Sequence, residues 1–269
     1  MGIMNQVTDR TSSRDLMCNT KNKGLQCKED IAMLKHQLSM DGYIVVDNLS
    51  SVVIEMLRDS VIERCNENLG KGRFLGWSDF VMRYETVPFV HEQIASKNDR
   101  LINGHYLDYL SRYLEIFFFS KFFGETLISD EEGYGQSEIY WRIVRPGRDC
   151  DIGPLHCDSW FWEANKWVIP SEYRRRFKMW LPLETAIGRN GLLVMPKSHR
   201  QKSYKYMIST DGKGKARPKI VDGPGRDKLF LLDVPVGSAV VFDDNLLHGG
   251  APNDSDKIRV SVELTVFVK

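Results

Sequence analysis

The feature that most constrains the fold is a change of pattern after Gly135. From that point the chain consists of short runs of apolar and β-branched residues, separated by Gly, Pro, Asp and Asn. The runs are SEIYWRIV, FKMWLPL, GLLVMP, KLFLLDV, SAVVFDD and IRVSVELTVFV. Runs of this length, without long helical patterns between them, are typical of antiparallel strands in a sandwich or barrel. The sequence therefore predicts a β core over residues 135–269.

Before that point the periodicity is helical. Apolar residues recur three and four positions apart over residues 28–40, 51–68 and 104–123. Between the first two of these patterns, the stretch YIVVDN predicts one short strand. We therefore expect a mainly β protein with added helices, in which a helical part, residues 28–130, packs outside the β core.

The bulk features exclude several classes of protein. Residues 1–27 are polar and aperiodic, which predicts a flexible leader followed by a single domain over residues 28–269. The formal net charge of +1 selects neither nucleic acid nor membrane as a partner, and no apolar run is long enough to span a bilayer. The five cysteines are scattered without a CxxC pair, which favours a cytoplasmic protein over a disulfide framework or a structural zinc site.

The stretch PLHCDSWFW places three types of metal ligand side by side. If these residues end a strand, His156 and Asp158 share one face and Cys157 points away, because side chains alternate along a strand. Such a pair alone is more often a turn with a hydrogen-bonded histidine. His248 is the best candidate for a third ligand, since it ends a strand pattern and precedes Gly-Gly, which allows a close backbone approach. Two histidines and one carboxylate are the facial triad of non-haem Fe(II) oxygenases.

A possible carboxylate-binding group follows in the last strand pattern. Arg259 stands eleven positions after His248, and alternation places it on one strand face with Ser261 and Glu263. A guanidinium with a neighbouring hydroxyl suits a carboxylate at the far end of a small molecule. Taken alone, Arg259 is more often an ordinary strand arginine, and the interpretation as a ligand-binding group depends on the triad.

Taken together, these residues resemble the iron/2-oxoglutarate oxygenases of the phytanoyl-CoA dioxygenase (phytanoyl-CoA hydroxylase) family. The stretch MWLPLETAIGRNGLLVMPKSHR, residues 179–200, is similar to the family's sequence between the ligands. The similarity spans residues 136–268. One departure is Lys197, which occupies a turn position where the family usually has glycine.

The resemblance implies a double-stranded β-helix (jelly-roll or cupin-like) core and a definite chemistry. His156, Asp158 and His248 would bind Fe(II), while Arg259 with Ser261 would hold the distal carboxylate of 2-oxoglutarate. The expected enzyme uses O2 to hydroxylate an unactivated C–H of a small molecule, with decarboxylation of 2-oxoglutarate to succinate and CO2. The carboxylate ligand disfavours halogenation. Desaturation, cyclisation or epimerisation in natural-product biosynthesis, and a non-catalytic metal-binding jelly-roll domain, stay open as alternatives.

The strand before the ligand motif offers candidates for the pocket wall. Alternation places Gln136, Tyr140 and Arg142 on one face, which is turned either to solvent or into the barrel. By analogy with relatives, Tyr140 is expected near the cosubstrate, and Gln136 and Arg142 near the substrate. Trp180, on a later strand, is expected beside the cosubstrate by the same analogy.

Two further segments could contact the substrate. Trp160 and Trp162 follow the ligand motif and either form an aromatic wall or pack beneath a loop. Residues 197–228 are rich in Lys and Arg and are expected to form an inserted loop. This loop could be a lid that recruits an anionic substrate, although charged loops are usually only solvated. No nucleic-acid-binding module accompanies the basic run, so nucleic acid is not an expected partner.

Overall fold

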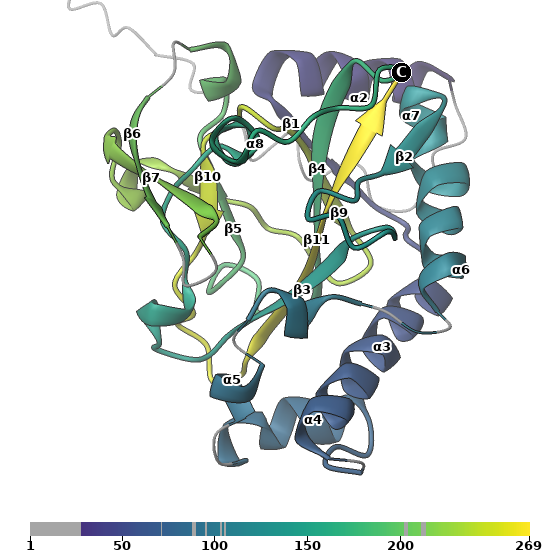
Figure 1. Cartoon of the computed structure of the whole chain (residues 1–269), viewed down its shortest axis with the longest axis vertical. Helices are drawn as coiled ribbons and strands as arrows, with labels where there is room; N and C mark the ends of the chain where they lie inside the picture. The colour runs from purple at the N-terminus through teal and green to yellow at the C-terminus, as the bar shows by residue number, and fades with distance from the viewer. Residues whose placement is uncertain are drawn as a thin grey trace, which may run out of the picture.

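The computed structural model describes residues 28–269 apart from residues 71, 88–89, 95, 103, 105, 202–203 and 211–213. The predicted leader lies outside the described residues. Two antiparallel sheets lie against each other, and helices cover the outer face of the larger sheet (Figure 1). The structure is thus mixed α/β, and its described strand pairs are all antiparallel, as the short runs after Gly135 predict.

The larger sheet has six strands in the order β1–β9–β4–β11–β2, and β3 pairs with β11 outside this path. Its strands are β1 (Tyr43–Val46), β2 (Thr126–Ile128), β3 (Ile139–Val144), β4 (Arg175–Glu184), β9 (Ala239–Asp243) and β11 (Arg259–Val268). The long strand β11 is its centre, because β2, β3 and β4 all pair with it. Since β1 and β2 precede residue 130, the part expected to be helical also contributes strands to the core.

Two smaller sheets complete the β structure. The first has the order β10–β5–β8 and consists of β5 (Leu192–Val194), β8 (Phe230–Leu231) and β10 (His248–Gly250). The second is a hairpin of β6 (Lys205–Thr210) and β7 (Ala216–Asp222). The hairpin corrects the expectation of an irregular loop over residues 197–228. Its strands flank the glycine-containing sequence DGKGK, a hairpin signal that the abundance of lysine and arginine obscures.

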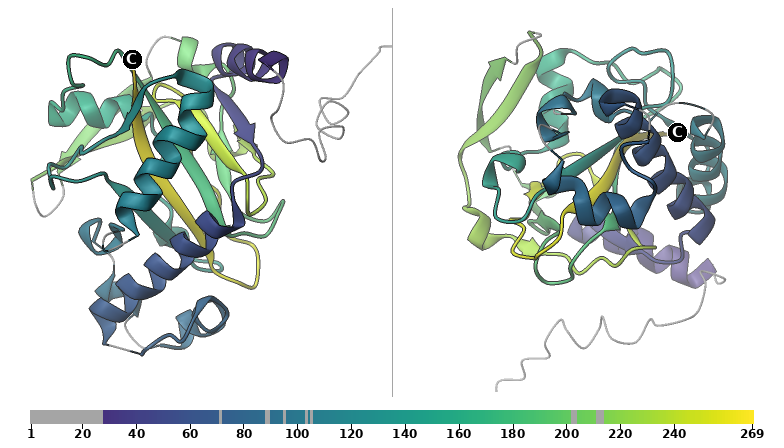
Figure 2. Two further views of the ribbon diagram at one scale, coloured as in Figure 1. Left: turned by 90° about the vertical axis from the view of Figure 1, so that its right-hand side faces the viewer. Right: turned by 90° about the horizontal axis from the view of Figure 1, so that it is seen from below.

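Helices cover the face of the larger sheet that is turned away from the smaller one (Figure 2). The longest is α3 (Ser51–Leu69), which buries Val53, Leu57 and Val61 in the main core. The others are α2 (Lys28–Asp41), α4 (Trp77–Arg83), α5 (Val90–Gln93), α6 (Leu107–Arg112), the π-helix η3 (Tyr113–Phe119), α7 (Ser120–Phe123) and α8 (Asp158–Asn165). Helix α8 packs beside the hairpin, in contact with β7 (Figure 1).

The helix expected over residues 104–123 is divided into three parts. The π-helix η3 separates α6 from α7. Its wider turn keeps Leu114 and Phe118 on the buried side, while Ile116 and Phe117 stay exposed. The spacing of apolar residues could not distinguish these helix types, because both place residues four positions apart near one face.

Alternation along β11 divides the larger sheet into an apolar and a polar face. Val260, Val262 and Leu264 pack with the helices in the main hydrophobic core. Arg259 and Glu263 lie on the other face and line a cavity that also has walls from the smaller sheet. The alternation expected for this strand is therefore confirmed at these positions.

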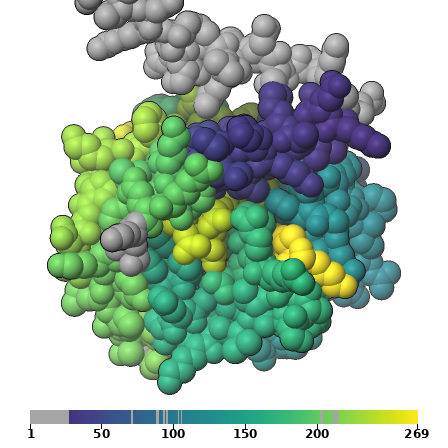
Figure 3. Space-filling view, turned by 90° about the horizontal axis from the view of Figure 1, so that it is seen from above, coloured from purple at the N-terminus to yellow at the C-terminus, as the bar shows by residue number. Residues whose placement is uncertain are grey.

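The turn that carries Lys197 has the conformation expected of a glycine. Lys197 has a φ of 69°, in the left-handed region, and its amide donates to the carbonyl oxygen of Asp41 at 2.8 Å. His199 and Arg200 also contact the carbonyl oxygen of Ser39 at the end of α2. In the space-filling view, α2, in purple, lies against the green segment that contains this turn (Figure 3). The lysine is thus accommodated in the turn at the cost of a strained backbone.

Within the described part of the chain, every helix is too short or too polar to cross a lipid bilayer.

Candidate metal centre and active-site cavity

Two of the three predicted metal ligands are joined through their backbones. His156 and His248 form an isolated antiparallel bridge, in which the amide of each donates to the carbonyl oxygen of the other at 3.0 Å. His248 also opens β10 and pairs with Val194 of β5, so the smaller sheet fixes its position. Asp158 is the first residue of α8, which corrects the expectation that it continues a strand. Because Cys157 before it is extended, both ligand side chains still face the cavity.

The three side chains converge on one space. One ligand atom from each lies within 4.8 Å of the other two. Nε2 of His248 is 3.4 Å from Oδ2 of Asp158, and Nε2 of His156 is 3.9 Å from Oδ1. Metal–ligand bonds of about 2.1 Å separate neighbouring ligand atoms by about 3 Å. The observed spacing is therefore close to what a single ion requires.

Each imidazole is oriented through its other nitrogen. Nδ1 of His156 donates to the carbonyl oxygen of Pro154 at 2.8 Å, and Nδ1 of His248 donates to that of Leu246 at 2.9 Å. These bonds leave both Nε2 lone pairs free to face the shared space. Burial, followed by the neighbouring His248 ring, lowers the pKa of His156 to about 4. The imidazole of His156 is therefore neutral at pH 7, as a metal ligand must be.

The carboxylate of Asp158 has an unfilled acceptor. Its Oδ2 atom is buried and has no hydrogen-bond partner among the described residues. Its Oδ1 atom is 3.8 Å from Nζ of Lys178, which also donates to Oγ1 of Thr265 at 3.1 Å. A buried carboxylate oxygen without a donor is costly unless a cation binds there. This orphaned atom fits a divalent metal ion between the three side chains.

The thiol between the two ligands is used elsewhere. Cys157 packs in a small apolar cluster and its Sγ donates to the carbonyl oxygen of Asn245 at 3.2 Å. Burial raises the pKa of this thiol, so it stays protonated at neutral pH. Both observations agree with its exclusion from the metal site.

Arg259 is a buried cation beside the triad. Its side chain is 1% exposed, its Nη1 donates to the carbonyl oxygen of Gly191, and its buried Nε has no partner among the described residues. Burial, followed by the positive charge of Arg142, lowers the pKa of Arg259 to about 9. A guanidinium in this state is stabilised by a carboxylate, which supplies both opposite charge and acceptors.

The two glycines after His248 make this packing possible. A Cβ on Gly249 would lie 2.8 Å from Cδ2 of Leu155, and one on Gly250 would lie 3.2 Å from Nη2 of Arg259. The close backbone approach that the Gly-Gly pair predicts is therefore observed.

The residues expected near the cosubstrate differ in their access to the cavity. Trp180 of β4 and Tyr140 of β3 line it. Ser261 is buried, but it does not belong to the cavity lining. The pairing of β11 with β4 shifts register between Val260 and Ser261, which locally disturbs the alternation on which its placement depends. Its role beside Arg259 stays a prediction.

Of the four residues expected near the substrate, two line the cavity and two do not. Arg142 and Trp162 line the cavity. Gln136 lies in a bend before β3 starts, outside the lining. Trp160 is also outside it and stacks on Tyr206 of the hairpin, with ring centres 4.6 Å apart. Of the two tryptophans, one is thus a wall residue and the other joins α8 to the hairpin.

The cavity, of about 600 Å³, also contains charged residues that the sequence did not reveal. They are Lys97, Arg100, Glu131, Glu132, Lys178 and Lys215. Strand alternation with Trp180 could have identified Lys178, since both belong to β4. The others come from segments without a regular pattern and meet only through tertiary packing.

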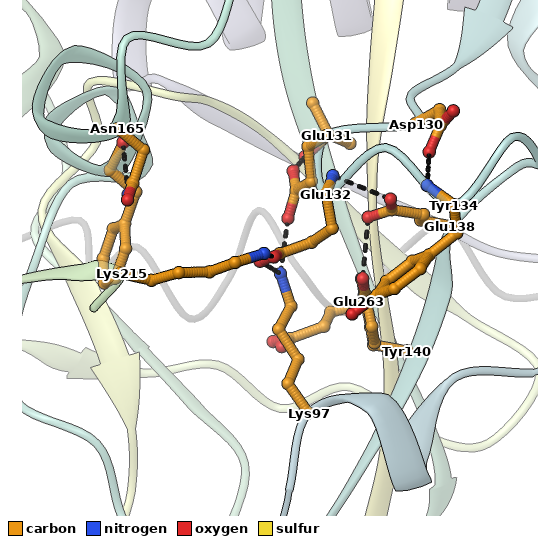
Figure 4. A network of polar contacts seen from close by, with 12 residues as sticks. Lys97, Asp130, Glu131, Glu132, Tyr134, Glu138, Tyr140, Asn165, Lys215 and Glu263 are labelled. Atoms are coloured by element: carbon orange, nitrogen blue, oxygen red, sulfur yellow. Dashed lines mark hydrogen bonds and ion pairs between the residues drawn. The ribbon is translucent and has the colours of Figure 1, made fainter. Parts of the chain in front are cut away.

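Most of these charges form one network of polar contacts (Figure 4). Nζ of Lys97 donates to Glu131 at 2.7 Å and to Glu132 at 3.0 Å, and it lies 4.2 Å from the ring centre of Tyr140. Glu132 also pairs with Lys215, which directly precedes β7 of the hairpin. The network therefore connects the hairpin to the wall that carries Lys97.

A sequence model of the phytanoyl-CoA dioxygenase family matches residues 119–261, more than half of the chain. The matched range begins in η3, before residues 136–268, over which the sequence resembles the family. It includes the triad and Arg259. No curated protein sequence matches the chain.

Solved structures share the fold. The apo form of the non-heme monooxygenase ThoJ superposes with a TM-score of 0.52 at 14% identity, covering 87% of this chain and 77% of that one. EctD from S. alaskensis, solved with 2-oxoglutarate and 5-hydroxyectoine, has a TM-score of 0.52 at 16% identity, covering 92% and 78%. At these identities the likeness shows the fold and does not define the reaction.

Proposed function

The chain belongs to the phytanoyl-CoA dioxygenase family, and from this premise we propose that it is an Fe(II)- and 2-oxoglutarate-dependent dioxygenase that hydroxylates an unactivated C–H of a small molecule. The observation that carries the proposal is the convergence of His156, Asp158 and His248 on one space beside the buried guanidinium of Arg259. This ligand set leaves three positions of an octahedral ion open, as cosubstrate and O2 require. In the proposal, the two sheets are the halves of a double-stranded β-helix that encloses the site.

The residues of the chain have separate roles in this proposal. Both Nε2 atoms and the carboxylate of Asp158 hold Fe(II), and the bonds made by Nδ1 keep the two rings in place. Arg259, with Ser261 as its neighbour on β11, binds the distal carboxylate of 2-oxoglutarate. When bound, Fe(II) and 2-oxoglutarate supply the oxidising chemistry, in which O2 is consumed and the cosubstrate becomes succinate and CO2.

The walls of the cavity position the substrate and exclude water. Phe242 packs its ring 4.6 Å from that of His248, and Trp180 and Leu192 lie beside it in the lining. Tyr140, across the cavity, donates its hydroxyl to Glu138 at 2.7 Å and is thereby fixed in orientation. We assign substrate contacts to Arg142 and Trp162, whose side chains reach the cavity, and none to Gln136 or Trp160.

The test is an anaerobic titration with Fe(II) followed by 2-oxoglutarate. We expect a weak visible charge-transfer band that is lost in His156→Ala and retained in His36→Ala, a matched change at an exposed position of α2. A wild-type protein that binds Fe(II) without ever producing this band would contradict the proposal. The mass of the product then separates outcomes, since hydroxylation adds one oxygen atom and desaturation removes two hydrogens.

A further inference from the structure

Apart from the metal ligands, the lining of the cavity has an excess of positive charge. Besides Arg259, its cationic lining residues are Lys97, Arg100, Arg142, Lys178, Lys215 and Arg217. Two carboxylates in the lining are set aside: Asp158 is a metal ligand, and Asp151 pairs with Arg145 outside the cavity. The remaining carboxylates are Glu131, Glu132 and Glu263. Six cations therefore face three anions in the space left for a substrate.

Lys97 argues against a cationic substrate held by the aromatic wall. Its Nζ lies 4.2 Å from the ring centre of Tyr140 and 5.8 Å from that of Trp167. It also donates to both Glu131 and Glu132 (Figure 4). The rings of Tyr140 and Trp167 and the two carboxylates, all of which could attract a cation, thus already contact an ammonium of the chain itself.

The cations near the metal site make few direct bonds to carboxylates. Burial alone would raise the pKa of Glu263, but Arg142, Lys178, Arg100 and Lys97 outweigh it and lower that pKa, so four cations act on this one carboxylate. Carboxylates act on Lys178 in turn, but the shortest carboxylate distance given for its Nζ is 3.8 Å, to Asp158. The closest approach of Arg142 to Glu263 is 3.5 Å, a long contact. Lys178 has three N–H donors and makes one hydrogen bond among the described residues, to Thr265. Both side chains therefore have donors left for a ligand.

We propose that the substrate is an anion whose carboxylate or phosphate group binds Lys178 and Arg142 beside the metal site. The inference rests on the function proposed above and names the substrate class of that site. Because Lys178 is 3.8 Å from the ligand Asp158, the charged group lies within a few bonds of the carbon that reacts. Phe161 and Trp162, in the same lining, receive the apolar body of the molecule. A small acid fits a cavity of about 600 Å³ that also holds the cosubstrate.

The test uses four ring compounds that differ in charge. The full chain, loaded anaerobically with Fe(II) and saturating 2-oxoglutarate, is titrated by calorimetry with phenyl phosphate, benzoate, benzyl alcohol and phenyltrimethylammonium. We expect an anion to bind at least about tenfold more tightly than the neutral and cationic compounds. The tighter of the two anions identifies phosphate or carboxylate as the preferred group.

Charge variants of the site should change the affinity for the anion in opposite directions. Lys178→Met and Arg142→Gln should each weaken binding of the preferred anion about tenfold, whereas Glu263→Gln should tighten it about threefold. A disturbed fold would weaken binding in all three, so the opposite sign for Glu263→Gln separates charge from damage. Lys121→Met and Arg112→Gln, at exposed positions outside the cavity, should leave binding unchanged.

Equal binding of all four compounds overturns the inference, and so does displacement of 2-oxoglutarate by the anions, because the site would then be the cosubstrate's. If Glu263→Gln does not bind the preferred anion more tightly than wild type, that result also counts against the inference. Failure of the proposed function has a different signature: the 2-oxoglutarate band is missing while the chain alone still prefers anions.

Discussion

At the metal ligands, Asp158 and Arg259 each keep a buried polar atom without a partner among the described residues, Oδ2 in one and Nε in the other. In the neighbouring network, Nζ of Lys97 donates to Glu131 at 2.7 Å and to Glu132 at 3.0 Å. Both regions bury charge, but only the second satisfies it within the chain. Buried atoms left unsatisfied cost stability and are stabilised only when a ligand arrives, whereas a satisfied network holds a wall in shape.

This comparison separates the expected effects of mutation. Variants at the metal site should lose activity and keep, or even gain, stability, since they relieve a desolvated charge. Variants in the network should lose stability first.

The largest effect is expected for Asp158→Ala. Without the carboxylate ligand, Fe(II) is held by two imidazoles only, and succinate formation should fall by about three orders of magnitude. The melting temperature should change little, because removal of a buried unsatisfied oxygen offsets the loss of the contact with Lys178 at 3.8 Å. Asp256→Ala, at an exposed position, is the matched control for the succinate assay and the melting curve. A large drop in melting temperature would break the comparison.

Next in size is Glu131→Gln in the network around Lys97. Burial alone would raise the pKa of Glu131, but Lys97 and Lys178 outweigh it and hold this pKa at about 2, below the usual value of 4.5. Its stabilising contribution is therefore complete above about pH 4.5 and is lost as the pH falls towards 2. We expect the variant to lose about 3 kcal/mol of unfolding free energy at pH 7.

Urea unfolding at pH 7 and pH 3 measures this effect, and the difference from wild type should shrink at the lower pH. Glu172→Gln, an exposed position, should show no such difference. A loss that stays constant across this range would mean that the ion pair does not stabilise the wall.

Arg259→Met sharpens the contrast from the metal site. The KM for 2-oxoglutarate should rise about 100-fold, because the distal carboxylate of the cosubstrate loses the buried guanidinium that binds it. The unfolding free energy should stay level or rise, since the buried Nε has no partner to lose. Steady-state kinetics and urea unfolding check the two halves of this prediction, with Arg112→Met as control. An unchanged KM would remove Arg259 from the cosubstrate site.

The smallest effect belongs to Lys197→Gly, which lies in neither region. Relief of the left-handed backbone at φ 69° should stabilise the fold by about 1 kcal/mol. Succinate formation should not change, which sets the baseline for the other variants. Lys197→Ala should bring no gain in a thermal unfolding scan, and an equal gain would mean that the backbone strain is not the cause.

The two regions also differ in how far the sequence predicts them. His156, His248 and Arg259 stand at ends or faces of strand patterns, so local spacing identifies them. The sequence pattern does not predict that α8 starts at Asp158. His156 at a strand end and Asp158 at a helix start can face the same way, just as two residues of one strand do. Charges such as Lys97 and Glu131 lie in segments without periodicity, and only tertiary packing brings them together.

The fold shows the same division. Antiparallel strands and the alternation along β11 follow from short-range pattern. Short-range pattern does not predict the π-helix within residues 104–123, because that helix depends on how aromatic residues fill the core. It also does not predict the β6–β7 hairpin, because the many charged residues obscure the strand pattern.

The backbone bridge between His156 and His248 has a consequence for how the protein acquires iron. Since their amides and carbonyls bond to each other at 3.0 Å, the spacing of the two rings is set when the chain folds and not when an ion enters. Under the proposed function, Fe(II) therefore binds reversibly to a site that is already formed. We expect the metal-free chain to stay folded and to become active when Fe(II) is added.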